Sequence, residues 1–253
     1  MKITAQMIVK NEENFVWYAI NSVIDWVDEM LVWDQGSSDK TIEIIKTINN
    51  PKITLKSFTE NVQILRQKML EETNNDWIFV LDGDEIWYES SIKYLVSSIQ
   101  SNFDCVVVPN YMLIGDIFHY QEKAAGRYKI AGKLGHYNIR AVRKTEGLHV
   151  EGIYPNEAYI TKEGIKVQNL NKERILFLDE PYLHASFLKR SSKDTKKIKY
   201  EIGESFPKDF YYPEVFFRGR PAIVPSPWKT MGGSYKFRAF IETPLKKIKR
   251  RLI

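Results

Sequence analysis

The chain has 253 residues, of which 43% are hydrophobic and 27% are charged, and this composition argues against a disordered or fibrous protein. It contains no run of roughly 18 apolar residues, which argues against a membrane-spanning helix, and its polar start (MKITAQ) is not expected to be a signal peptide. The single cysteine, Cys105, excludes an intramolecular disulfide and a cysteine metal cluster, so we expect a buried thiol in a cytoplasmic protein.

Apolar runs alternate with helical spacing through the first hundred residues. We expect strands at residues 3–9, 30–34, 53–58 and 77–81. Between them, apolar residues at helical spacing predict a helix over 12–24, a helix carrying Ile42, Ile45 and Ile48, and a helix that begins near Asn61. Strands that alternate with helices in this way are typical of βαβ units and a largely parallel sheet.

The pattern changes after residue 90. We expect one more helix over 91–99, and shorter strands at 105–108, 136–142, 157–160 and 165–170. A lysine-rich helix is predicted over 191–200, and the prolines and aromatic residues of 206–228 disfavour regular structure. The predicted fold class is α/β, with a mainly parallel sheet flanked by helices, a smaller mixed-strand region and a helical C-terminal tail. We divide the chain into a domain over 1–190, with halves 1–100 and 101–190, and an extension over 191–253.

Three carboxylates follow the fourth predicted strand. The run Trp77-Ile-Phe-Val-Leu ends in Asp82-Gly83-Asp84-Glu85. In open α/β sheets ligands bind outside the carboxyl ends of the strands, where a D-x-D turn presents oxygens to a divalent metal and to a phosphate-bearing ligand. The alternative is a plain hairpin, because Asp-Gly after an apolar run is also a strong turn signal.

Three segments in order along the chain resemble family 2 glycosyltransferases, which have the GT-A (Rossmann-like) fold. They are residues 7–13 (MIVKNEE), residues 32–41 (VWDQGSSDKT), and the Asp82-Gly-Asp84 turn. The resemblance covers about the first ninety residues well and the remainder loosely. It implies an enzyme that uses a nucleotide-diphosphate sugar donor and a divalent metal, Mn²⁺ or Mg²⁺.

The resemblance implies roles for four residues of the first half. Asp84 is the leading metal ligand, and Asp82 contacts the sugar, the ribose or metal-bound water. Asp34 would accept hydrogen bonds from the base or ribose of the donor, unless it is only the first residue of a turn. Arg66 corresponds to a family arginine near the donor, and its alternative is a solvated helix face. Asp39 is expected to support its loop as a helix N-cap.

Two segments of the second half resemble family motifs more loosely. His184, in PYLHASF, would complete a Mn²⁺ shell or contact the diphosphate, although isolated histidines are often structural. Glu157 closes Tyr154-Pro-Asn-Glu157, which is similar to the x-H-E segment of lipopolysaccharide-type transferases, and Asn156 replaces the histidine. Glu157 is therefore the candidate general base of an inverting displacement, followed by Glu151 and Asp116.

Several basic residues are further candidates. Lys189 and Arg190 follow His184 closely and are candidates for phosphate binding. Arg140 and Arg143 resemble the family's R-x-x-R region, where an interior arginine would require a paired acid.

The predicted function is metal-dependent transfer of a sugar to a glycan or lipid-linked acceptor. The first alternative is a haloacid-dehalogenase-type phosphatase, whose D-x-D motif also follows a strand. The second is a non-catalytic carbohydrate- or membrane-binding protein on a transferase scaffold. No nucleic-acid partner is expected, because the basic residues do not form a recognisable recognition motif.

The C-terminal tail is basic and amphipathic. Its apolar residues recur at helical spacing, with Pro244 interrupting them, and basic residues at 246–251 lie beside them. The apolar residues are Phe237, Phe240, Ile241, Leu245, Ile248 and Leu252. We expect peripheral attachment to an anionic membrane on its cytoplasmic face, or else a helix that docks on its own domain.

Overall fold

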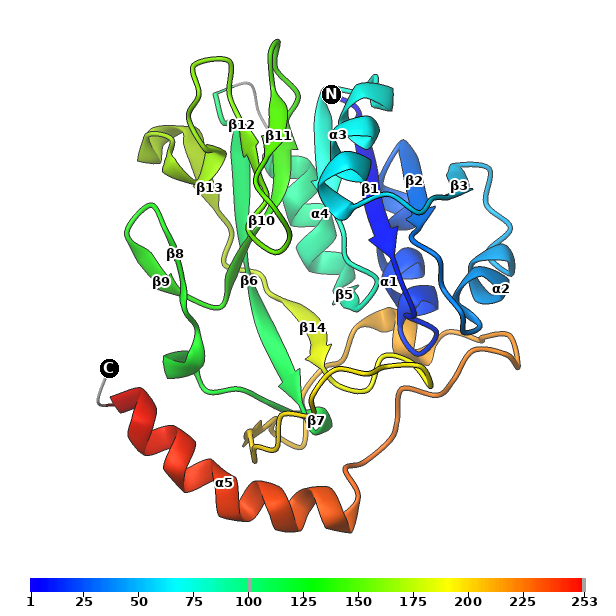
Figure 1. Ribbon diagram of the computed structural model, residues 1–253, viewed down its shortest axis with the longest axis vertical. Helices are drawn as coiled ribbons and strands as arrows, with labels where there is room; N and C mark the ends of the chain where they lie inside the picture. Colours follow the sequence, from blue (N-terminus) through cyan, green and yellow to red (C-terminus); the bar gives the residue numbers. More distant parts are fainter. Residues whose placement is uncertain (100–101, 252–253) are drawn as a thin grey trace.

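The computed structural model describes residues 1–99 and 102–251 (Figure 1). Its first half alternates strands and helices, as predicted. The elements in chain order are β1 (Ile3–Val9), α1 (Val16–Val23), β2 (Glu29–Asp34), α2 (Thr41–Lys46), β3 (Ile53–Ser57), α3 (Val62–Glu72), β4 (Trp77–Val80), β5 (Glu85–Trp87) and α4 (Glu89–Ser98). The helix expected over 12–24 begins only at Val16, because residues 12–15 form a turn in which the carbonyl of Glu12 accepts from the amides of Phe15 and Val16.

The second half consists mainly of short strands. They are β6 (Cys105–Ile114), β7 (Asp116–Tyr120), β8 (Tyr128–Ile130), β9 (Lys133–Gly135), β10 (Tyr137–Arg143), β11 (His149–Glu151), β12 (Ala158–Ile160), β13 (Ile175–Phe177), β14 (Tyr182–Phe187) and β15 (Glu204–Ser205). The chain then forms the helix α5 (Gly233–Arg251). Leu252, which belongs to the predicted apolar tail, lies outside the described residues.

One sheet joins the two halves. Its main path runs β15-β7-β6-β10-β4-β1-β2-β3, and β5, β13 and β14 branch from it. The strands β4, β1, β2 and β3 run parallel to one another, whereas β10 is antiparallel to both β4 and β6. The predicted fold is thus confirmed: a parallel half continues into a mixed half, and helices flank the sheet.

Both faces of the parallel half are covered. Alternate residues of β2 point to opposite faces, so Met30 and Val32 join the large core with α1, while Leu31 and Trp33 pack against α3. Leu65 and Met69 are the buried residues that α3 contributes to this smaller cluster. Nearly every residue of β1, β2 and β4 is therefore buried.

The strand β6 is longer than the 105–108 predicted. Proline lacks an amide hydrogen, so a strand would be expected to stop at Pro109. Instead β6 changes partners there: its pairing with β10 ends at Pro109, and its pairing with β14 begins at Asn110. The strand β14 also pairs with β5, the strand that follows β4 in the chain.

Two predicted elements are wrong. Residues 165–170 form a single 3₁₀ turn (Val167–Asn169) with one bridge from Lys166 to Ile160, because the exposed Ile165 has no core to pack on. Residues 191–200 form no helix. Side chains bind the backbone there instead: the amide of Ser192 donates to Glu13, and the amide of Lys196 donates to Asp194, which competes with helical hydrogen bonds.

The segment 206–228 is irregular as predicted, apart from one 3₁₀ turn at Glu214–Phe217. The tail is helical, and Pro244 lies inside α5 instead of ending it. Among the described residues, no helix combines the length and apolar character that crossing a membrane requires. The division of the chain at residue 190 stays a prediction.

Candidate active site

The turn between β4 and β5 holds the three carboxylates. The strand β4 pairs with β1 and β10, while β5 pairs with β14, so the two strands are not a hairpin and the turn connects different parts of the sheet. A Cβ at Gly83 would lie 2.9 Å from Cγ of Glu12 and 3.1 Å from Cγ1 of Val9. Glycine is therefore required because the turn passes directly against the loop that follows β1.

Arg140, on β10, pairs with two acids of the turn. Its Nη2 donates to Oδ2 of Asp82 at 3.1 Å and also to Oε1 of Glu85, and its Nε donates to the hydroxyl of Tyr182 at 3.1 Å. The guanidinium is buried, so the paired acid expected for an interior arginine is present. Burial raises the pKa of Glu85 to about 7, although the attraction of Arg140 opposes that rise.

His184 enters the site from β14. The register of β5 and β14 sets His184 opposite Glu85, with 3.9 Å between His184 Nδ1 and Glu85 Oε1. The Nε2 atom of His184 lies 3.4 Å from Oδ1 of Asp84. Burial opposes ionisation of both groups, but their mutual attraction prevails: the pKa of Asp84 is lowered and the pKa of His184 is raised.

Arg190 and Glu12 complete the cluster on the other side of Asp84. Arg190 Nη1 lies 2.5 Å from Oε1 of Glu12 and 3.5 Å from Oδ2 of Asp84. Burial, and secondly the charge of Asp84, raise the pKa of Glu12 well above the usual value, although Arg190 opposes the shift. The Oε2 atom of Glu12 has no hydrogen-bond partner among the described residues. The protonation state of the acids in this cluster therefore depends on the positively charged side chains beside them.

The donor set fits a divalent metal. Asp82, Glu85 and His184 each offer one ligand atom, and these atoms all lie within 4.8 Å of one another. The Nδ1 atom of His184 is buried and has no hydrogen-bond partner in the described chain. Carboxylate oxygens suit Mg²⁺ and Mn²⁺, and an imidazole nitrogen shifts the preference towards Mn²⁺. Asp84 adjoins this group through His184, and its role as a metal ligand stays a prediction.

A cleft of about 1130 Å³ opens over the turn. Its wall includes residues of β8, β10, α3, the loop before β12 and the segment after β14. Arg66 and Glu157 face each other in it, with 3.9 Å between Arg66 Nε and Glu157 Oε1. Arg66 Nη1 and Glu157 Oε2 are buried and lack hydrogen-bond partners in the described structure. Both predicted residues therefore line the cleft, and each keeps one buried polar atom without a hydrogen-bond partner in the described structure.

Asp34 has a different environment. Its Oδ2 accepts from the amides of Gly36 and Ser37, both at 3.0 Å, and only 1% of the residue is exposed. The neighbouring Gln35 lines the cleft, and Asp34 is not among the lining residues. The structure thus shows the turn contacts that the sequence left open, and binding of the donor by Asp34 stays a prediction.

Asp39 fastens the extension to the first half of the chain. Its Oδ1 accepts from the amide of Thr41, and its Oδ2 accepts from the hydroxyl of Ser191 at 2.5 Å. With the bond from the amide of Ser192 to Glu13, this contact holds the segment after β14 against the loops that follow β1 and β2. Arg190 is thereby positioned over Asp84.

Other sequence candidates lie away from the cleft. Asp116 accepts from the amides of Phe118 and Met231 and lies against His119. Glu151 pairs with His149 on the surface. Lys189 is exposed outside the cleft lining, and Arg143 lies 4.0 Å from Asp104.

Two residues of the site have no sequence-based prediction. Glu12 belongs to the quoted MIVKNEE segment, but a carboxylate in a polar loop gives no sign of burial. Lys196 lines the cleft, and its charge acts on both Glu12 and Asp84. The sequence gives no sign of this position for Lys196, because a lysine-rich helix over 191–200 would expose its lysines to solvent.

The chain matches one protein family and is similar in sequence to several known proteins. Residues 4–152 match the family described as glycosyl transferase family 2. The SPbeta prophage-derived glycosyltransferase SunS of Bacillus subtilis (strain 168) is 30% identical over 113 residues, which cover 42% of this chain and 26% of that protein. An uncharacterized glycosyltransferase of Rickettsia bellii is 41% identical over 102 residues, or 38% of this chain and 33% of that protein. The chain thus spans 26% to 33% of the length of these curated relatives.

The fold also resembles a solved structure. The crystal structure of S. aureus TarS superposes with a TM-score of 0.52 at 16% sequence identity, covering 73% of this chain and 60% of that one. At this identity the likeness concerns the fold alone.

Proposed function

Because the chain belongs to glycosyl transferase family 2, we propose that it is an inverting, metal-dependent enzyme that transfers a sugar from a nucleotide-diphosphate donor to a glycan or lipid-linked acceptor. The observation that carries the proposal is the convergence of Asp82, Asp84, Glu85 and His184 at the end of β4, where all but Glu85 line a large cleft. Ligands of open α/β sheets bind at such strand ends.

The leaving nucleoside diphosphate needs positive charge. When bound, Mn²⁺ or Mg²⁺ supplies it to the diphosphate oxygens, and Asp82, Glu85 and His184, with Asp84 beside them, would hold the ion. Arg190 and Lys196 supply further positive charge from the segment after β14. The bond between Arg190 and Glu12 holds the guanidinium over the turn before the donor binds. The diphosphate of the donor would then compete with Glu12 for Arg190.

The acceptor must lose a proton as it attacks. In the proposed displacement, the acceptor oxygen forms a bond to the anomeric carbon while the bond from that carbon to the diphosphate oxygen breaks. The hydroxyl proton passes to Glu157, whose Oε2 is buried in the cleft wall without a partner among described residues. A single attack on the face opposite the leaving group inverts the anomeric configuration. Arg66 orients Glu157 through their ion pair.

The two alternative functions are disfavoured. A haloacid-dehalogenase phosphatase carries its D-x-D motif after the first strand of its fold, whereas these acids follow β4. A non-catalytic scaffold would have no need of unpartnered polar atoms on Arg66, Glu157 and His184 inside one cleft. Family membership also favours the transferase over both alternatives.

Calorimetric titration with UDP, GDP, CDP and dTDP, each with and without Mn²⁺, tests the donor site. We expect one diphosphate to bind with an affinity that depends on the metal. Absence of metal-linked binding to all four overturns the proposed donor site. Turnover of the matching sugar nucleotide, followed by proton NMR of the anomeric centre of the product, then tests inversion. Retention of configuration would contradict the single displacement.

A further inference from the structure

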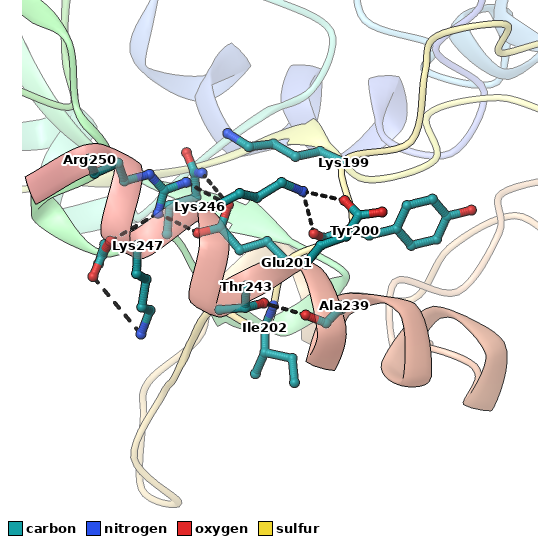
Figure 2. Close-up of polar contacts among 12 residues, drawn as sticks. Lys199, Tyr200, Glu201, Ile202, Ala239, Thr243, Lys246, Lys247 and Arg250 are labelled. Atoms are coloured by element: carbon teal, nitrogen blue, oxygen red, sulfur yellow. Dashed lines mark hydrogen bonds and ion pairs between the residues drawn. The ribbon is translucent and has the colours of Figure 1, made fainter. Parts of the chain in front are cut away.

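The helix α5 packs on the protein with its polar side. Thr243, Lys246 and Arg250 face the body of the protein, and Figure 2 shows these side chains beside residues 200–202. Thr243 Oγ1 accepts from the amide of Ile202, and Lys246 Nζ donates to the carbonyl of Tyr200. Arg250 forms a bidentate ion pair with Glu201. The buried Ala239 and the hydroxyl of Tyr235 continue this side towards the start of the helix.

The opposite side of α5 is apolar and exposed. At 100° per residue, its five large apolar side chains form one stripe that points away from Thr243 and Arg250. Each is more than half exposed: Phe237 71%, Phe240 72%, Ile241 53%, Leu245 67% and Ile248 56%. A surface helix of a globular protein normally buries its apolar stripe and exposes its polar one. The reversed orientation of α5 leaves a face that requires a partner.

Basic residues border this stripe on both sides. Lys236 and Lys247 lie along one edge, and Arg238 and Lys249 lie along the other, with Arg251 at the end of the described helix. Lys236, Lys249 and Arg251 are exposed and form no ion pair with residues 1–99 or 102–251. The only acid of α5, Glu242, is paired with Arg238 and Lys246.

The charge pattern identifies the partner. We propose that the outward face of α5, defined by its five apolar side chains and the lysines and arginines beside them, docks on an anionic lipid membrane. An interfacial helix buries its apolar face at the headgroup boundary while flanking cations meet anionic lipid. A second copy of the chain fits less well, because two such faces would bring like charges together.

A neighbouring groove supports the same partner. A hollow of about 420 Å³ lies beside the first turns of α5, lined by Phe237, Phe240, Met231, Ile202, His119 and Lys236. Its lining is mainly apolar, and Lys236 stands at its border. This combination suits an acyl chain with an anionic headgroup, and the groove is continuous with the exposed stripe through Phe237 and Phe240.

Docking would also fix the direction in which the cleft faces. In Figure 1, α5 runs along one end of the molecule, next to the segment that follows β14. This segment carries Lys196 into the cleft and Glu201 onto α5, so one short stretch of chain joins the membrane face to the active site. Docking through α5 does not require transfer activity.

Co-sedimentation of the full chain with vesicles tests the proposal. Vesicles of phosphatidylcholine and phosphatidylglycerol in equal parts should bind the protein, whereas pure phosphatidylcholine should bind it weakly, and high salt should reduce binding. Reversing the charge of Lys249 and Arg251 (K249E/R251E) should weaken binding at least about 25-fold, since each lost basic contact costs about fivefold. The matched control K46E/K208E makes the same charge change at exposed lysines elsewhere and should bind nearly as the unchanged protein.

The apolar stripe needs a separate variant. F240S/L245S removes two exposed side chains, and we expect binding to fall about tenfold or more, whereas L134S/I165S at exposed sites elsewhere should leave it unchanged. All four variants should keep the melting temperature, because the substituted side chains are exposed. Equal binding by F240S/L245S and its control overturns the proposal. So does a protein that ignores anionic vesicles and instead forms a dimer that F240S/L245S dissociates.

Discussion

Glu85 and His184 are directly opposite each other in the antiparallel pair of β5 and β14. This register brings the imidazole to the acids of the β4–β5 turn, 3.9 Å from Glu85 and 3.4 Å from Asp84. A shift of one residue would turn His184 to the other face of the strand. The composition of the site is therefore set by a backbone pairing, and its side chains can be tested one at a time.

The Asp84→Asn variant should lose transfer activity and keep its fold. Asparagine retains the shape of the side chain but removes the charge between His184 and Arg190, so we expect turnover to fall about 10²- to 10³-fold. The measurement is initial rate with saturating donor and metal, with circular dichroism to verify folding. Asp25→Asn, at an exposed ion pair with Arg218, is the control and should remain fully active. Near-normal turnover of Asp84→Asn would remove Asp84 from the metal site.

The Glu157→Gln variant separates chemistry from donor binding. A general base acts only during the chemical step, so kcat should fall about 10²- to 10⁴-fold while the Kd for the nucleoside diphosphate changes little. Glu151→Gln is a matched control, because Glu151 is exposed and pairs with His149 outside the cleft. Loss of donor binding with intact chemistry would assign Glu157 to the donor site.

Replacing His184 should alter the choice of metal. His184→Ala removes the only nitrogen of the donor set, so affinity for Mn²⁺ should fall at least about tenfold, and Mg²⁺ should be less affected. Manganese binding is followed by electron paramagnetic resonance of the free ion. His149→Ala, on the surface, should bind Mn²⁺ normally. An unchanged Mn²⁺ affinity in His184→Ala would exclude the imidazole as a ligand.

Glu85 should make the metal-free protein less stable as pH rises. The pKa of this carboxyl is about 7 in the folded protein against an ordinary value of 4.5, chiefly because it is buried. The folded state therefore holds the proton more tightly, and stability from this group falls between pH 4.5 and 7, by about 3 kcal/mol in total. Urea unfolding with chelator across this range measures the slope. Glu85→Gln should flatten it, and an equal slope in both proteins would contradict the raised pKa.

Gly83→Ala should disturb the turn through steric contact alone. The new Cβ would lie 2.9 Å from Cγ of Glu12, so the turn or the loop after β1 must move, and activity should fall although no charge changes. Gly219→Ala is the control, since a Cβ there meets nothing within 4 Å. Comparable activity of both variants would show that the turn tolerates displacement.

Local patterns in the sequence were sufficient to predict the strands and helices of the parallel half of the fold. The acids of the β4–β5 turn directly follow a fully apolar strand, so their place at a sheet edge follows from the order of residues alone. For Arg140 the sequence indicated only that an interior arginine would need a paired acid. That its partners are Asp82 and Glu85 depends on β10 pairing with β4 from 55 residues away, and no local pattern encodes that pairing.

The contacts of Arg190 and Lys196 could not be predicted either, because they also depend on residues that are far apart in the sequence. Arg190 contacts Glu12 across 178 residues of sequence, and the loop that carries it is held by hydrogen bonds to Glu13 and Asp39. Those bonds replace the helix that helical propensity predicts over 191–200. Lys196 reaches the cleft only because that helix is absent.

The polar packing of α5 has a thermodynamic consequence. The heat-capacity change of a transition follows the apolar area that it exposes, and lifting α5 would expose mainly the groups that Lys246, Thr243 and Arg250 contribute. Detachment of the helix would therefore change the heat capacity of the protein very little. It would respond instead to ionic strength, because screening weakens the pair between Arg250 and Glu201. Attachment of the helix to the protein should accordingly weaken as the salt concentration rises.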